Sequence, residues 1–349
     1  MADASQQEPA PPPPPPPPWG PPPVWYPPPY GWHPHVAMPQ QLGSGRFRSM
    51  NVGELLDAVF SLYRRNFVLI AAISALVQVP FAALRYVAFQ VSGFADLQGR
   101  LQDASNSLST PGVAPSDSQL QQLFGIAGAV ALVSLLLGLI SALVVQPLAV
   151  AATTRAVSDR YLDRPASIAT SYAAALRRLG ALVVQSLILF FGAAVLILAA
   201  ALVIALFAAV AGVIALPVAL VLGIGALVLA VWVYVQTSLT APAIVLEHLS
   251  GVRGLARSWR LVHAMFWRIF GILALVILIT AIIGGILGLI LGVAGTALDA
   301  NGRFIVQQVA SAVAAVFVSP IMYIALTLLY YDARIRKEAF DIEMLAQSL

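Results

Sequence analysis

Hydrophobic positions form long uninterrupted runs in this sequence. From Leu179 to Leu246 the chain continues for 68 residues without an Asp, Glu, Lys, Arg or His. A helix crosses the hydrocarbon core of a bilayer with about 20 apolar residues, so this run is long enough for two crossings joined by a tight turn. The pattern predicts a protein that resides in a membrane.

Six apolar stretches of spanning length follow one another. They lie at about 67–90, 122–150, 180–206, 213–242, 270–296 and 305–331. The predicted fold class is all-α: a polytopic membrane protein with six transmembrane helices in three hairpins. We expect an integral membrane domain over residues 50–345, preceded by a separate tail over residues 1–45.

Basic residues gather on alternate loops between these spans. Sixteen of the 19 Lys and Arg residues fall before the first span, between spans two and three, between spans four and five, or after the sixth. The other loops and ends receive only Arg85, Arg100 and Arg303. Because basic residues in short loops are retained on the cytoplasmic side, both termini are predicted to be cytoplasmic.

Each arginine-rich segment also has the spacing of an amphipathic helix that leads into a hairpin. Asn51 and Glu54 stand at capping-box spacing in the first segment, Pro165 suits a first helical turn in the second, and Ser250 precedes the third. The third segment is the clearest, with apolar residues at three- and four-residue steps: Val252, Leu255, Trp259, Val262 and Phe266. Either a threefold structural repeat or three unrelated hairpins with basic inner loops would give this pattern.

Prolines support the repeat. Pro147, Pro242 and Pro320 recur in the second helix of each predicted hairpin, toward its cytoplasmic end. Each proline removes a backbone hydrogen bond and favours a kink. In the fifth span, Gly284, Gly288 and Gly292 share one helix face, which predicts close packing against a helix of the same chain or of a second copy. The oligomeric state stays open.

The tail is a low-complexity segment. Residues 1–45 contain 17 of the 25 prolines, including the unbroken run Pro11–Pro18, and should form disordered or extended polyproline II chain without a core. Its Pro27, Pro28, Pro29 and Tyr30 match the PPxY pattern that aromatic-lined WW grooves bind. The tail is interpreted either as a docking site for a protein partner or as a flexible solubilising segment.

The composition points away from catalysis. The chain has no cysteine, and its histidines, His33, His35, His248 and His263, are divided between the tail and a loop next to the membrane. Neither a cluster of carboxylates and histidines nor a phosphate-binding glycine loop is present in the sequence. We therefore expect no enzyme, no catalytic or metal site, no cofactor and no nucleic-acid partner. Arg85 and Glu247 lie toward helix ends, where snorkelling to the headgroups is the ordinary explanation.

The cytoplasmic arginines allow one positive function. Arg253, Arg257, Arg260 and Arg268 are candidate contacts for anionic membrane lipid, because arginines at headgroup level attract lipid phosphates. The alternative is that these residues only set the topology.

Three segments carry a resemblance to a known family. They are GVRGLARSWRLVHAMFWRIFGILAL from Gly251, the terminal LTLLYYDARIRKEAFDIEML, and MNVGELLDAVFSLYRRNF over Met50–Phe67. Together they resemble the membrane domain of glycerophosphoryl diester phosphodiesterase, a bacterial integral-membrane family. The resemblance implies a free-standing domain in the bacterial cell membrane without the family's catalytic barrel, and no catalytic residue carries over to this sequence.

Two function classes follow. The first is a membrane protein of binding or scaffolding type, whose tail recruits a partner. The second is a permease-like or lipid-handling protein, favoured by the kinked helices, the glutamines within spans and the inner arginines. A polar-lined opening in the membrane domain would favour the second class.

Overall fold

The structure is a computed structural model that describes residues 49–94, 100, 117–211 and 215–338. The chain divides into two units, Met1–Gly45 and Arg46–Leu349, and all described residues belong to the second. The proline-rich tail, with its motif at Pro27, Pro28, Pro29 and Tyr30, lies outside the described residues.

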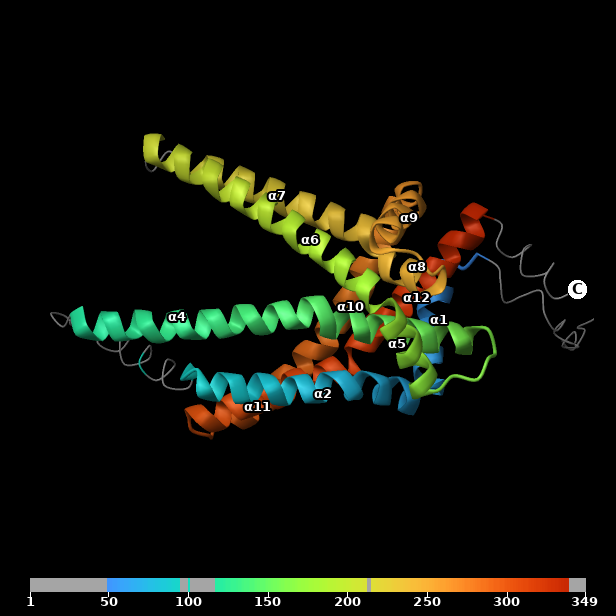
Figure 1. The fold of residues 1–349 in the computed structure, drawn as a ribbon, viewed down its shortest axis with the longest axis horizontal. Coiled ribbons are helices and arrows are strands. Elements are labelled where there is room, and N and C mark those ends of the chain that lie inside the picture. Colours follow the sequence, from blue (N-terminus) through green and yellow to red (C-terminus); the bar gives the residue numbers. More distant parts are fainter. Residues whose placement is uncertain (1–48, 95–99, 101–116, 212–214, 339–349) are drawn as a thin grey trace, which may run out of the picture. The chain divides into compact units, whose positions relative to one another are not determined.

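The described part of the chain is built from helices (Figure 1). In chain order they are α1 (Val52–Arg65), α2 (Phe67–Val91), α4 (Asp117–Ile140), the π-helix η1 (Ser141–Val145), α5 (Gln146–Tyr161), α6 (Ile168–Ala211), α7 (Ala215–Thr237), α8 (Thr240–Leu246), α9 (Gly251–His263), α10 (Phe266–Gly295), α11 (Ala300–Phe317) and α12 (Ser319–Glu338). Six segments are long and apolar enough to cross a membrane: Phe67–Val91, Phe124–Tyr161, Ile168–Ala209, Pro217–Leu246, Phe266–Gly295 and Asn301–Glu338. Each overlaps one predicted span, so the all-α, six-span prediction is confirmed for these residues.

Two of the short helices begin where the local sequence predicts. At α1, the Glu54 amide donates to Asn51 Oδ1 at 2.8 Å and the Asn51 amide donates to Glu54 Oε2 at 2.9 Å, which completes the capping box. At α9, Ser250 occupies the N-cap position, but its side chain makes no capping hydrogen bond.

The second arginine-rich segment differs from the other two. Residues 168–211 form one continuous helix, so the expected short helix at 165–178 is the first part of α6. The chain between α1 and α2 turns at Asn66, whose side chain donates to the Leu62 carbonyl at 3.0 Å and ends α1. The corresponding part of α6 has only Gly180 as a helix breaker, and a single internal glycine costs a helix about 1 kcal/mol, too little to end it.

Each recurring proline stands at the start of a new helix. Pro147 follows the π-helix η1, Pro242 follows a turn at Ser238 and Leu239, and Pro320 follows a break at Val318. A proline lacks the amide that would continue the preceding helix and clashes with the carbonyl four residues earlier. At Pro147 the change is from π-helix to α-helix without a break, whereas Pro242 and Pro320 follow true breaks. These three interruptions of the α-helical pattern support the repeat, which stays a prediction.

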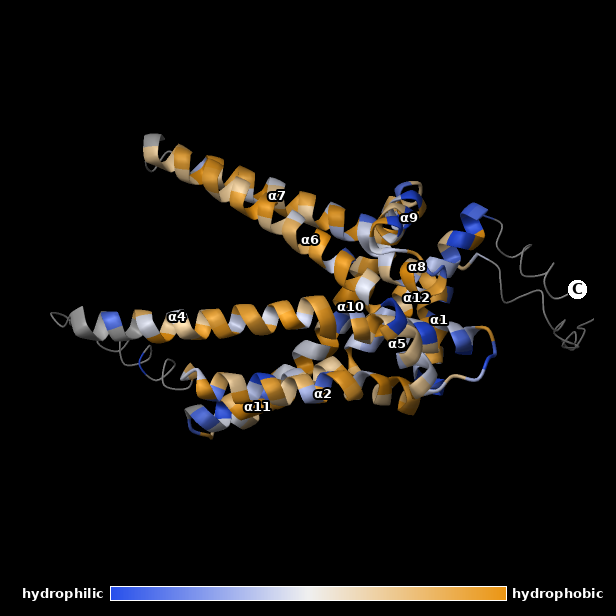
Figure 2. Ribbon diagram, viewed as in Figure 1, coloured by the Kyte–Doolittle hydropathy of each residue, from blue (hydrophilic) through white to orange (hydrophobic). Residues whose placement is uncertain are grey.

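The largest buried cluster brings α12 against α1, α9 and the first half of α10. Its fully buried members include Leu55, Leu261, Ile272, Ile324 and Tyr330. Along the remaining lengths of the spans, leucine, isoleucine and valine side chains are exposed, including Leu198, Leu220 and Leu289. Figure 2 shows these lengths of helix as mostly hydrophobic. Exposed apolar surface of this extent is the surface that a lipid-facing helix presents.

The long helices pack in pairs. Helix α6 runs beside α7 and α10 beside α11, whereas α2 makes more extensive contacts with α11 than with α4 (Figure 1). The glycine face of α10 does not pack closely, because a Cβ atom added at Gly284, Gly288 or Gly292 would meet no atom within 4 Å. Close packing against a helix of the same chain is therefore not found at these three positions, where a groove of about 460 Å³ lies between α10 and α11. Packing against a second copy stays a prediction.

Candidate functional site

Charged residues gather where α1, α5, α8, α9, the first turn of α10 and the second half of α12 meet. This region, called here the charged end, carries much of the hydrophilic colouring of the ribbon (Figure 2). The four sequence-predicted lipid contacts all belong to it. Arg253, Arg257 and Arg260 lie on α9, and Arg268 lies in the first turn of α10. The structure divides them into two pairs with different environments.

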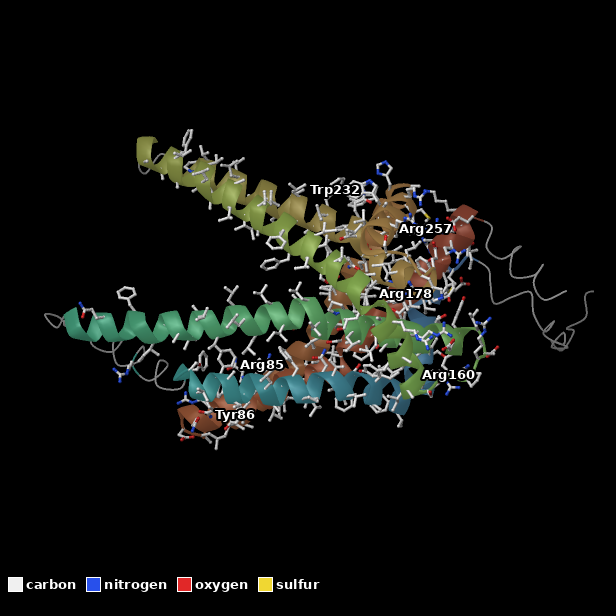
Figure 3. All side chains as sticks on the ribbon, viewed as in Figure 1. Arg85, Tyr86, Arg160, Arg178, Trp232 and Arg257 are labelled. Carbon is white, nitrogen blue, oxygen red and sulfur yellow. The ribbon has the colours of Figure 1, made fainter. Side chains whose placement is uncertain are left out.

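Arg257 is held by two carboxylates. Its Nε donates to Glu247 Oε1 at 2.9 Å, and its Nη2 donates to Glu247 Oε1 and Glu338 Oε2 at 2.7 Å each. Tyr330 donates to the same Glu247 oxygen, and Arg334 Nε donates to Glu338 Oε2 at 3.2 Å. The two arginines and two glutamates balance in charge and join α8, α9 and α12 (Figure 3).

This network also explains the state of the Arg257 guanidinium. Burial alone would lower the pKa of Arg257, but hydrogen bonds and charge attraction from Glu338 and Glu247 together raise its pKa above the ordinary value. Most of its five N–H donors already form hydrogen bonds with these two carboxylates. Arg257 therefore anchors α9 to the bundle.

Arg268 has a comparable structural role around Asp332. Arg268 Nη2 lies 3.0 Å and Arg336 Nε 3.1 Å from Asp332 Oδ2, while the Met50 amide donates to Asp332 Oδ1 at 3.0 Å. Both arginines also donate to the Met50 carbonyl. The Asp332 side chain is only 3% exposed. These bonds fasten the residue that precedes α1 to α10 and α12.

Arg253 and Arg260 are exposed and pair with no carboxylate in the part of the chain that the structure describes. The same helix and the next one carry exposed apolar and aromatic side chains: Val252 (62% exposed) and Trp259 (40%) lie on α9, and Trp267 (78%) lies in the first turn of α10. Trp259 packs edge-on against Trp232 of α7, with ring centroids 5.0 Å apart (Figure 3). Exposed arginines beside exposed tryptophans are typical of a helix at the membrane–water interface.

Helix α9 is held rigidly in this position. A Cβ atom at Gly251 would stand 2.5 Å from the Ala181 carbonyl oxygen of α6, so only glycine allows the two helices to approach so closely. Ser258 donates to the Gln236 carbonyl at 2.7 Å and accepts from the Leu239 amide at 3.2 Å. The buried Ser258 hydroxyl thus bridges the break between α7 and α8 and ties α9 to it.

Sequence reasoning missed the acidic half of the site. Glu247 does not snorkel but joins the Arg257 network, and Asp332 and Glu338 come from the last helix. The signal available was three acids inside arginine-rich segments of an otherwise nearly uncharged chain. Spacing could not pair them, because Arg257 and Glu338 are separated by 81 residues and Arg268 and Asp332 by 64.

The six apolar helices and the arginine-rich end define the class as a multi-pass membrane protein. The chain belongs to the family described as Domain of unknown function (DUF7847), which matches residues 50–333, from Met50 to Ala333 in the second half of α12. No curated protein and no solved structure matches the chain.

Proposed function

We propose that this protein is a binding protein of the cell membrane, in which the exposed side of α9 holds anionic lipid of the cytoplasmic leaflet. The observation that carries the proposal is the division among the four arginines. Arg257 and Arg268 pair with carboxylates, whereas Arg253 and Arg260 are exposed on the helix that also carries the exposed Trp259.

The chemistry of this surface fits a lipid headgroup. An arginine near an anionic membrane surface contributes about 1 kcal/mol of attraction, and tryptophans anchor at the depth of the headgroups. Because Gly251, Ser258 and Arg257 already fix α9, little ordering entropy is lost when lipid binds. The positive-inside pattern supports a cytoplasmic location for the charged end and both termini.

The test is native mass spectrometry of protein extracted with its own lipids. We expect retained anionic lipid in the wild type and loss of at least part of it in the double variant Arg253→Gln/Arg260→Gln. The matched control is Arg64→Gln/Arg65→Gln, which removes two exposed arginines from α1 at the same end of the bundle. Equal loss in both double variants, or no loss in either, would contradict a specific site on α9.

A second function is proposed for the tail, on the observation that Pro27, Pro28, Pro29 and Tyr30 form a PPxY sequence in a proline-rich segment. In this scaffolding role the tail recruits a protein partner with an aromatic-lined groove. Deleting residues 1–45 should remove that partner from an affinity purification. An unchanged set of co-purifying proteins would refute the docking role.

Neither role involves a chemical step. The resemblance to the glycerophosphoryl diester phosphodiesterase membrane domain supports a bacterial membrane protein without the catalytic barrel, and we propose no enzymatic activity. Purified protein should therefore leave glycerophosphodiesters intact with or without divalent metal. Turnover that persists after contaminating hydrolases have been removed would overturn this assignment.

A further inference from the structure

A second polar feature lies away from the charged end, within the spans. A cavity of about 390 Å³ is bounded by α2, α4, η1 and α11, and its wall includes the side chain of Arg85 (Figure 3). Hydroxyl and amide groups share the wall, among them Ser134, Ser141, Gln307 and Ser311. Arg85 is 18 residues beyond the start of α2, or about 27 Å along the helix, so this cavity is separate from the α9 surface.

Arg85 differs from the other part-buried arginines of the spans and their ends. Its Nε is shielded from solvent and has no hydrogen-bond partner, and no carboxylate pairs with it among the side chains that the structure describes, those of residues 49–94, 100, 121, 124–209, 217–299 and 301–338. The charge of Arg257 is instead neutralised by Glu247 and Glu338, and that of Arg268 by Asp332. A cation without a counter-ion at membrane depth is costly, and such residues usually mark binding sites.

Snorkelling, the ordinary explanation for an arginine toward a helix end, places the guanidinium in headgroups or water. The Nε of Arg85 is instead shielded from solvent, and the side chain lines the cavity. Gln78 and Ser74, 7 and 11 residues before Arg85 and so on the same face of α2, also have buried polar atoms without partners. This face of α2 carries more polar groups than the packing of the helices satisfies.

The rest of the cavity wall is aromatic and rigid. Phe94 packs against Phe89 and Phe304 with ring centroids 5.0 and 5.1 Å apart, and Phe304 is 5% exposed. Gln90 Nε2 donates to Asn301 Oδ1 at 3.1 Å, which fastens α2 to α11 beside this cluster. Ser141 begins the π-helix η1, and single-turn π-helices are frequent at functional sites.

We propose that this cavity binds an oxyanion of phosphate or carboxylate type, with Arg85 as its counter-charge. The planar guanidinium offers paired N–H donors that match either oxyanion, and Ser141, Gln307 and Ser311 supply neutral hydrogen-bonding groups around it. The volume falls within the range of roughly 300 to 1,000 Å³ that small-ligand pockets occupy. The phenylalanines suit an apolar chain attached to the anion, as in an anionic lipid or a fatty acid.

The proposal is tested by thermal unfolding of the full-length protein in zwitterionic detergent. Four additives are compared: short-chain phosphatidylglycerol, a medium-chain fatty acid, short-chain phosphatidylcholine and inorganic phosphate. We expect the midpoint of wild type to rise by several degrees with an oxyanion and not with phosphatidylcholine. In Arg85→Met the rise should disappear and the affinity should fall at least tenfold.

Controls separate binding from structure. Without additive, Arg85→Met should unfold at or above the wild-type temperature, because it removes an unpaired cation, whereas a merely structural arginine would leave the variant less stable. Arg303→Met, on α11, should keep the wild-type response. The response should also persist in Arg253→Gln/Arg260→Gln, so failure of the α9 proposal would be visible separately.

The additives distinguish the sources of the anion. A rise with inorganic phosphate equal to that with phosphatidylglycerol assigns the site to a free oxyanion, and a rise with the amphiphiles alone assigns it to a lipid or fatty acid. No oxyanion response in wild type, or an undiminished response in Arg85→Met, would overturn the proposal.

Discussion

At the scale of single residues, the position of each arginine in the fold decides whether its side chain pairs with a carboxylate or stays exposed. Arg257 and Arg268 lie within a few turns of Arg253 and Arg260, yet the first pair is consumed by Glu247, Glu338 and Asp332 while the second pair faces outward. We expect the stability of the charged end to depend strongly on Asp332, because Arg268, Arg336 and the Met50 amide all donate to its buried carboxylate.

Asp332→Ala should destabilise the fold strongly. The substitution leaves Arg268 and Arg336 without their counter-ion. Removing one partner of a buried ion pair typically destabilises a fold by about 3 to 5 kcal/mol. We expect about 3 kcal/mol here, because the Arg268 and Arg336 side chains are 24% and 31% exposed. The midpoint of thermal unfolding in detergent, followed by circular dichroism, measures the effect. Asp57→Ala is the control, since Asp57 is exposed on α1 and its loss should change stability by less than about 0.5 kcal/mol. Similar midpoints for the two variants would show that the Asp332 contacts contribute little.

At the scale of elements, neighbouring residues in the sequence determine where helices begin, whereas contacts between helices depend on residues far away in the sequence. The capping box of α1 and the interruptions at Pro147, Pro242 and Pro320 follow from neighbouring residues. The docking of α9 does not, because it depends on the carbonyl of Ala181 in another helix.

Gly251→Ala should loosen α9 from α6. The new Cβ would stand 2.5 Å from the Ala181 carbonyl oxygen, so the backbone of one helix must shift, at a cost of about 1 to 3 kcal/mol. The unfolding midpoint should fall, and a protease should cut the α8–α9 connection faster. Gly284→Ala provides the comparison, because nothing lies within 4 Å of its Cβ and alanine is the better helix former. If Gly251→Ala were as stable as Gly284→Ala, the close approach of α9 to α6 would not be required.

At the scale of the whole molecule, the charged end gathers the ends of several spans on one side. The largest core is built around α12, and the remaining lengths of the spans expose apolar surface of the kind that faces lipid. The arginine count predicts the orientation in the membrane. On this prediction His263, just before α10, and Ala297, just after it, lie on opposite sides.

Single-cysteine labelling tests this orientation directly, because the chain has no cysteine of its own. In intact cells, Ala297→Cys should react with a membrane-impermeant maleimide, whereas His263→Cys should react only after the membrane is opened. Both positions are exposed, so burial does not bias the comparison. The reverse pattern would invert the topology and place the α9 surface outside the cell.

The sequence by itself determined the class, the six spans and the helix starts that depend on neighbours, because hydropathy and capping are local and additive along the chain. It identified the four arginines of α9 and the first turn of α10 as a group, but it could not show that Arg257 and Arg268 pair with carboxylates, since Glu338 and Asp332 lie on a distant helix. Only the tertiary structure decided those pairings, the open glycine face of α10 and the cavity at Arg85, because each requires side chains or backbone from helices far apart in sequence to meet, or fail to meet, in space.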